Sequence, residues 1–293
     1  MRGWQSECLC AVLIVIGFAF SAPAEDERGW NFSGRFSGSS NSSGLVLKAD
    51  PALGYKFNEH FQTYAGLPVY FVNASSTTTT ATATSSGFVN GIGNAYVGFR
   101  LGVDNDTVNY ASNLVFTAPT GDKDKGFSTG RATVDWNNNF SRKFSSVTPF
   151  GNVGIANTIS DTSFFVRPFT SLGFVGHFDG GATVSLSQFV DVGASAYAVR
   201  ASGQQRIISK IRKRQSTTTS PSSSGPGQGA AKNRVFETSS ETVGSADIAN
   251  DHGVSAWLGV SPRSSVDFQI GYTRSVGYDL DTLFFGVGFR FGK

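Results

Sequence analysis

Histidine is the side chain best suited to proton transfer near neutral pH, and the chain has three, His60, His177 and His252. A hydrolase needs a nucleophile, a base and an orienting group within hydrogen-bond distance of one another. The strands predicted below place His60 and His177 near one end of the molecule and His252 near the other. The sequence also contains no G-x-S-x-G, H-E-x-x-H or phosphate-loop pattern. We therefore expect no enzymatic activity and no cofactor.

Residues 1–24 have the features of a secretory signal peptide. Arg2 supplies a positive charge, an apolar stretch follows at 8–20, and small residues end at Ala24, after which we expect cleavage. An uncleaved membrane anchor is the alternative, but the apolar stretch is shorter than the roughly 20 residues a spanning helix needs. Both cysteines of the precursor lie in this segment, so the mature chain is expected to form no disulfide and no thiolate metal site.

The composition limits the classes of protein to which the chain can belong. Charged residues make up 15% of the chain, whereas a typical soluble domain has about a quarter. The formal net charge of +3 is too small to indicate a nucleic acid partner. Because no later stretch approaches 18 apolar residues, any membrane crossing after residue 24 must use strands.

The clearest strand pattern is at the C-terminus. In 283–291 the odd positions are all large and apolar, while the even positions are one Phe, two Gly and one Arg. Successive side chains of a strand point to opposite faces, so one face of this segment is apolar throughout. The same alternation recurs in 94–103, 190–198, 254–260 and 266–273. Repeated segments of about 10 residues with this period are typical of outer-membrane barrels.

The pattern predicts an all-β fold over residues 25–293, a transmembrane up-and-down antiparallel β-barrel of about twelve strands. The alternation continues beyond 177, so the assignment of 176–188 stays open. The predicted strands are 29–39, 44–57, 60–72, 91–103, 107–118, 129–140, 146–157, 163–177, 189–200, 252–261, 265–274 and 282–291.

The lengths of the connections agree with this arrangement. Outer-membrane barrels have short periplasmic turns and longer extracellular loops, and they have an even number of strands. With the first strand running outward, four of the five periplasmic connections are short, the exception being 178–188, and the three longest connections fall on the other side. The short ones are 58–59, 104–106, 141–145 and 261–264, and the long ones are 73–90, 119–128 and 201–251.

A secreted β-sandwich is the alternative, since sandwiches also alternate. Its core would have to form from the polar face of Gly, Ser, Asn and charged residues, which is unfavourable. Aromatic residues near strand ends also indicate the interface girdles of a membrane barrel. These residues are Trp30, Tyr55, Phe57, Trp136 and Phe140.

The segment 201–251 is expected to be a long disordered external loop. Residues 215–229 are rich in Ser, Thr, Pro and Gly and offer little apolar surface for a core. A basic run precedes them, consisting of Arg206, Lys210, Arg212, Lys213 and Arg214. This run could contact the phosphates of lipopolysaccharide, or it could simply be solvated.

Strand parity predicts which side chains face the barrel interior. Charged residues there could attract or orient a solute, or they could pair across the lumen and fill it. Inward aromatic residues could contact an apolar solute or only pack the lumen. The candidate lumen residues are Arg35, Lys48, Tyr64, Tyr96, Arg100, Arg131, Asp135, Arg167, Asp191, Tyr197, Trp257, Asp267 and Arg290.

The segment Phe116–Asp122 ends a predicted outward strand, so Pro119, Thr120, Gly121 and Asp122 lie at the external mouth. They could shape a gate, although Thr-Gly-Asp is also ordinary turn chemistry. Together with the later Thr-Pro-Phe-Gly sequence at 148–151, the motif resembles outer-membrane barrels grouped with the MetA pathway of phenol degradation.

That resemblance implies transport of hydrophobic or aromatic compounds. It also implies a terminal aromatic residue for recognition by the barrel assembly machinery, which would be Phe291, although Gly292 and Lys293 follow it here. We expect a Gram-negative outer-membrane channel through which a small, apolar or aromatic solute diffuses passively. The alternative is a structural or surface-interaction barrel that acts through its external loops. Outer-membrane lipid and lipopolysaccharide are the expected surroundings.

Overall fold

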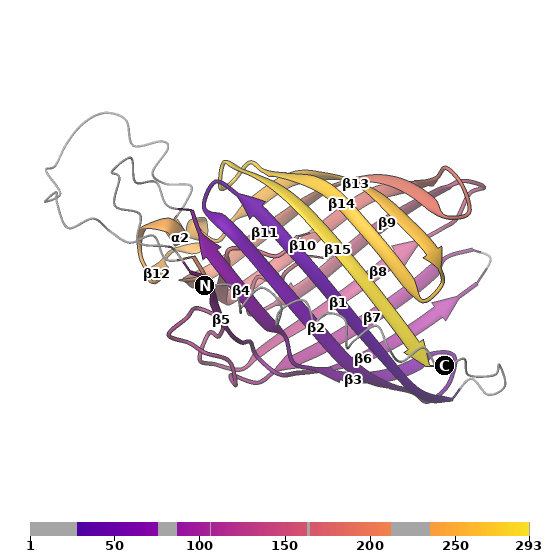
Figure 1. Ribbon diagram of the computed structural model, residues 1–293, viewed down its shortest axis with the longest axis horizontal. Helices are drawn as coiled ribbons and strands as arrows, with labels where there is room; N and C mark the ends of the chain where they lie inside the picture. Colours follow the sequence, from indigo (N-terminus) through magenta and orange to yellow (C-terminus); the bar gives the residue numbers. More distant parts are fainter. Residues whose placement is uncertain (1–27, 76–86, 106, 163–164, 212–234, 293) are drawn as a thin grey trace, which may run out of the picture.

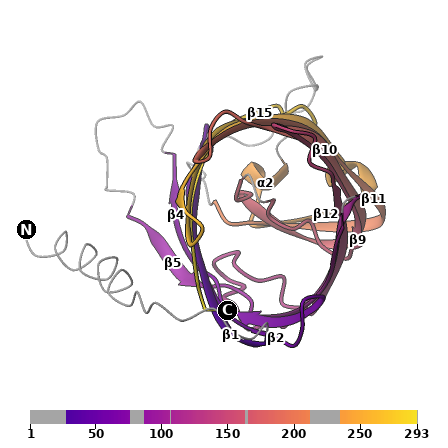
Figure 2. The same ribbon diagram turned by 90° about the vertical axis from the view of Figure 1, so that its right-hand side faces the viewer.

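The computed structural model describes residues 28–75, 87–105, 107–162, 165–211 and 235–292, and the predicted signal peptide lies outside them. The chain forms one antiparallel sheet that closes on itself (Figures 1 and 2). Closure occurs at β1 (Gly29–Asn41), which pairs with both β2 (Gly44–Lys56) and β15 (Leu280–Gly292). A closed sheet leaves no wall edge unpaired, as a lipid environment requires.

Twelve strand positions make up the wall, as predicted. The third consists of β3 (Phe61–Gly66) and β4 (Val69–Ala74), and the fourth of β5 (Val89–Ile92) and β6 (Tyr96–Asp104). The third is interrupted beside Pro68, which has no N–H for the ladder. The remaining strands are β7 (Asn109–Thr117), β8 (Thr133–Ser141), β9 (Val147–Ala156), β10 (Phe169–Ser185), β11 (Val190–Ser209), β13 (Asp251–Arg263) and β14 (Val266–Ser275).

The outer face of the wall is apolar. Large hydrophobic side chains are exposed along it, as expected for a lipid-facing band and not for a soluble sandwich. Among the described residues, no helix is long and apolar enough to cross a membrane. Examples of the exposed side chains are Phe32, Leu53, Val97, Phe116, Trp136, Ile155, Phe178, Leu258, Ile270 and Leu283.

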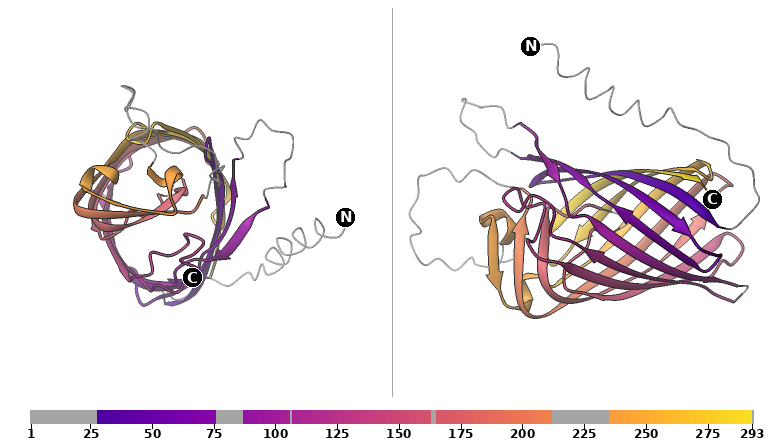
Figure 3. Two further views of the ribbon diagram at one scale, coloured as in Figure 1. Left: turned by 90° about the vertical axis from the view of Figure 1, so that its left-hand side faces the viewer. Right: turned by 90° about the horizontal axis from the view of Figure 1, so that it is seen from below.

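The two ends of the barrel differ. At the turn end, near the C-terminus, all five connections are short: 57–60, 105–108, 142–146, 186–189 and 264–265. At the loop end, Figure 3 shows α2 (Val235–Thr238) and β12 (Glu241–Gly244) gathered opposite the C-terminus. Short turns mark the periplasmic side of such barrels, so the turn end corresponds to the side predicted to face the periplasm.

Two boundary predictions were wrong. The strand predicted at 163–177 is β10, which begins at Phe169, so the ambiguous stretch 176–188 belongs mostly to this strand. Pro168 removes a ladder donor just before it, and the preceding residues fold into the barrel. Similarly, β8 begins at Thr133 and not at 129, because Gly130 has a left-handed φ of 69°.

The prediction of disorder throughout 201–251 was also wrong for its described parts. Residues 201–209 extend β11, and β12 pairs with this extension. Phe236 of α2 stacks on Phe169 with ring centroids 5.1 Å apart and contacts Tyr278 at 5.9 Å. These rings and the short 3-10 helix η2 (Ala246–Ile248) cover part of the loop end. Residues 212–234 lie outside the described part.

Candidate functional site

The candidate site is the interior of the barrel. Several of its charges pair along the wall and not across the lumen. Asp267 lies 3.6 Å from the Arg35 guanidinium and 2.8 Å from that of Arg290, and Lys48 lies 3.0 Å from Asp50. Such pairs keep charged walls compatible with partial burial.

After β9, residues 157–162 and 165–168 of the connecting loop lie inside the barrel and cross its interior. Three hydrogen bonds attach it to three different strands. Ser160 donates to Asp135 of β8 at 2.6 Å, and the Ile159 N–H donates to the Ser171 hydroxyl of β10 at 2.6 Å. The Val166 N–H donates to the Ser39 hydroxyl of β1 at 2.7 Å, from the far side of the barrel. The loop therefore constricts the lumen.

Ion pairs hold the same loop at two points. Asp161 is 3.4 Å from both Lys48 of β2 and Lys210, which follows β11. Burial alone raises the pKa of Asp161, but the two ammonium groups outweigh burial and lower that pKa to about 2. Arg167 pairs with Asp251 of β13 at 3.2 Å. These two anchors of the loop, Asp161 with its lysines and Arg167 with Asp251, bring together residues distant in sequence.

A second inward loop, 118–132, contains the predicted mouth residues and attaches to the break between β5 and β6. The Gly121 N–H donates to the Asn94 side chain at 3.0 Å, and the Asp122 N–H donates to the Ile92 carbonyl at 3.1 Å. A Cβ on Gly121 would lie 2.6 Å from backbone of Gly93, so this approach requires glycine.

Thr120 accepts from the Ala95 N–H at 2.8 Å, while Pro119 is exposed. Further along, Phe127 stacks on Tyr70 of β4 at 5.3 Å. These contacts support the turn interpretation of residues 119–122: they attach the loop to the wall.

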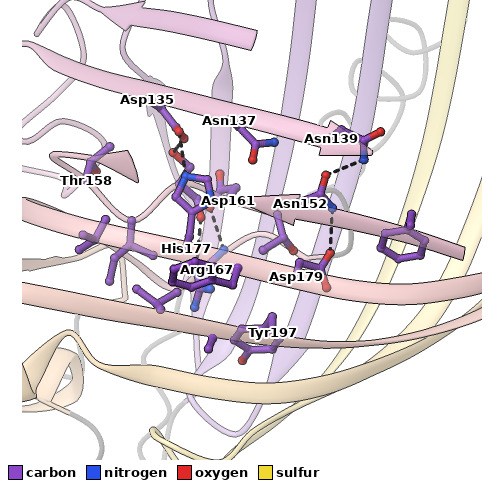
Figure 4. Close-up of a pocket in the computed structure, with 18 of the residues that line it drawn as sticks. Asp135, Asn137, Asn139, Asn152, Thr158, Asp161, Arg167, His177, Asp179 and Tyr197 are labelled. Carbon is purple, nitrogen blue, oxygen red and sulfur yellow. Dashed lines mark hydrogen bonds and ion pairs between the residues drawn. The ribbon is translucent and has the colours of Figure 1, made fainter. Parts of the chain in front are cut away.

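The constriction leaves two cavities on either side of residues 158–162. One, of about 440 Å³, is lined by β8, β9, β10 and β11 together with Trp257, and Figure 4 shows its polar residues. The other, of about 500 Å³, is lined by residues that include Arg35, Lys48, Tyr64 and Tyr96. A third cavity, of about 450 Å³, lies at the turn end around Arg100.

One cluster has the residue types of a hydrolase but not their order. His177 lies 2.9 Å from Asp135 and Ser160 donates to that same carboxylate, so the carboxylate sits between the other two groups (Figure 4). A catalytic triad needs the histidine between serine and carboxylate. The sequence placed His177 near the inner end of its strand, but it lies in the middle of β10. The cluster positions the loop.

Most predicted lumen residues line these cavities or share their strand face. Two do not occupy the predicted strand positions. Arg131 is exposed in loop 118–132, because β8 starts later than predicted. Arg167 is 2% exposed in the inward loop, not on a strand. Those on the inner face are Arg35, Lys48, Tyr64, Tyr96, Arg100, Asp135, Asp191, Tyr197, Trp257, Asp267 and Arg290.

Part of the basic run also has described partners. Arg206 lies 2.8 Å from Glu241 of β12, and Lys210 is almost fully buried beside Asp161. These two residues are thus internal contacts, which does not support a free lipopolysaccharide-binding surface at them. The other three basic residues lie outside the described residues.

Sequence reasoning missed Asp161, Asp179 and Asp251. A signal for the inward loop was present, since Phe165 and Val166 are unusually apolar for a solvated loop and Pro168 interrupts the predicted strand. No local pattern revealed which carboxylates these loop residues would meet.

The closed wall, apolar band and constricted polar lumen define an outer-membrane β-barrel, the class to which the chain belongs. Among solved structures it is similar to an outer membrane channel from Pseudomonas putida F1, with 9% identity, 92% of this chain and 100% of that one covered, and a TM-score of 0.54. This likeness establishes the fold.

Two porins give weaker likenesses. The NanC porin has 10% identity and a TM-score of 0.46, with 88% of this chain and 98% of that one covered. The KdgM porin in complex with disordered oligogalacturonate has 7% identity and a TM-score of 0.47, with 89% of this chain and 99% of that one covered. No family model matches the sequence, and no curated protein matches it either. The resemblance to MetA-pathway barrels therefore stays a hypothesis.

Proposed function

We propose that the protein is a passive outer-membrane channel for small solutes that carry an aromatic or apolar part. The observation that carries this proposal is the constricted lumen, in which residues 158–162 separate two cavities of several hundred Å³. Each cavity combines polar groups with aromatic rings: Tyr64 and Tyr96 in one, at 6.1 Å between centroids, and Phe150 and Trp257 in the other, also at 6.1 Å. Sites of this composition suit small amphipathic molecules.

Conductance of the refolded chain starting at Glu25 in a planar lipid bilayer tests the proposal. Reproducible discrete steps are the expected result, because a solute path also admits ions. A barrel that is folded but never conducts would contradict a passive channel.

The position of the constriction can be tested separately with cysteine, since the chain from Glu25 contains none of its own. A Ser160→Cys variant treated with a charged thiol reagent should show a clearly altered conductance. Ala194→Cys is the matched control, because Ala194 is exposed on the outer face of β11. Equal effects at both positions, or none at Ser160, would place the ion path elsewhere.

A further inference from the structure

The cavity of about 440 Å³ has one carboxylate whose charge the described protein does not compensate. Asp179 of β10 accepts a hydrogen bond from the Asn152 amide at 3.3 Å, which in turn lies 2.6 Å from Asn139 (Figure 4). Among the described residues, no Lys, Arg or His nitrogen comes within 4.0 Å of the Asp179 carboxylate, and the side chains that neighbour its oxygens, Asn152 and Ser195, are uncharged.

The other carboxylates and the guanidinium of this cavity each have a lysine, a histidine or a carboxylate beside them. Asp161 lies between two lysines, and Arg167 pairs with Asp251. Asp135 pairs with His177 and accepts from Ser160. Of the charges that line the cavity, that of Asp179 therefore remains available to a bound cation.

Aromatic rings surround the same space. Tyr197 is the register partner of Asp179 on β11, and Phe150 and Trp257 also line the cavity. The cavity already places one cation against rings: the Arg167 guanidinium lies 4.9 Å from the Phe165 centroid and 5.7 Å from that of Tyr197. A carboxylate beside aromatic faces is the combination that binds organic ammonium groups.

We propose that this cavity is a binding site for small organic amines, with the ammonium group on Asp179 and the apolar part against Phe150 and Trp257. The amides of Asn139 and Asn152 fix the carboxylate in place through their hydrogen-bonded chain. Partial burial makes an uncompensated carboxylate unfavourable, and a bound ammonium relieves this cost.

The inference names the solute class of the proposed channel and so rests on that function for its biological meaning. Its test does not need conduction. Equilibrium dialysis of the detergent-solubilised, folded barrel compares three probes of similar shape: 2-phenylethylammonium, 2-phenylethanol and phenylacetate. A barrel that binds but never conducts would count against the channel and not against the site.

The ammonium probe should bind about tenfold or more tightly than the alcohol, and phenylacetate most weakly, as expected for a charge-assisted hydrogen bond. Asp179→Asn should remove the preference for the ammonium probe. Asp191→Asn is the matched control, since Asp191 of β11 faces the barrel interior but does not line this cavity. It should leave binding unchanged.

Equal binding of the three probes to the unmodified protein would overturn the proposal, whatever the folding of the variants. An equal loss in both variants would also overturn it, because attraction by the overall charge of the lumen would then explain the binding. Circular dichroism and heat-dependent gel mobility check that each variant is folded.

Discussion

Arg167 and Asp251 form an ion pair across the barrel interior, with 3.2 Å between Nη1 and Oδ2 and side chains that are 2% and 0% exposed. Asp251 also accepts hydrogen bonds from Tyr197 at 3.0 Å and from Ser275 at 2.6 Å. The pair joins the inward loop to β13, and it is the more deeply buried of the two anchors that hold the constriction.

Removing the cation of this pair should be strongly destabilising, because it leaves the Asp251 charge buried without compensation. We expect Arg167→Met to cost about 3–5 kcal/mol in the free energy of unfolding, measured in urea. It should also release the loop and increase the single-channel conductance. Arg263→Met, at an exposed position of the turn end, should change neither quantity. An unchanged free energy of unfolding in Arg167→Met would show that the ion pair does not stabilise the fold.

The second anchor should weaken in acid. The pKa of Asp161 is about 2 in the folded protein, below its ordinary value near 4. A lowered pKa stabilises the folded state fully above the unfolded pKa, and this stabilisation is lost as pH falls from about 4 to about 2. Loop docking, measured as protection of an Ile159→Cys variant at this buried, 5% exposed position from thiol reagents that react in acid, should decline over that window. In an Asp161→Asn background the decline should be absent; an identical decline would assign it to another group.

The second inward loop should depend on Gly126. This residue has a φ of 78°, and an added Cβ would lie 1.9 Å from the Ser209 carbonyl oxygen. We expect Gly126→Ala to lower the free energy of unfolding by at least about 2 kcal/mol, since left-handed strain and the contact add together. Gly203→Ala is the control, with a φ of 71° and nothing within 4 Å of its Cβ, so it should show the strain alone. Equal costs would show that the contact is unimportant.

The lipid-facing band predicts an effect opposite to that in a soluble protein. Ile270 is 60% exposed on the outer face of β14, where a charge would normally be tolerated in water. In a membrane, Ile270→Arg should cost about 2–4 kcal/mol of folding free energy in lipid vesicles. Val276→Arg, beyond the end of β14 at the loop end, should cost about 0–1 kcal/mol. Comparable small costs at both sites would contradict the placement of the band.

The wall of the barrel could be predicted because its signal is local. In β15, alternate residues of one short segment show which face is apolar, and the short turn 264–265 shows that β13 and β14 are neighbours. The number of strands and the inward position of residues such as Arg100 and Trp257 follow from that period of two. Where the signal failed, as at Arg131, a left-handed glycine had shortened the strand.

The constriction could not be predicted in this way. Arg167 and Asp251 are separated by 84 residues, and their meeting depends on the closure of the sheet and on the inward path of a loop that starts on another strand. The sequence by itself determined the strands, their faces and the membrane class, because these depend on neighbours within a few residues. Only the tertiary structure decided which charges are compensated and that Asp179 is not, because burial and pairing depend on groups that chain closure brings together.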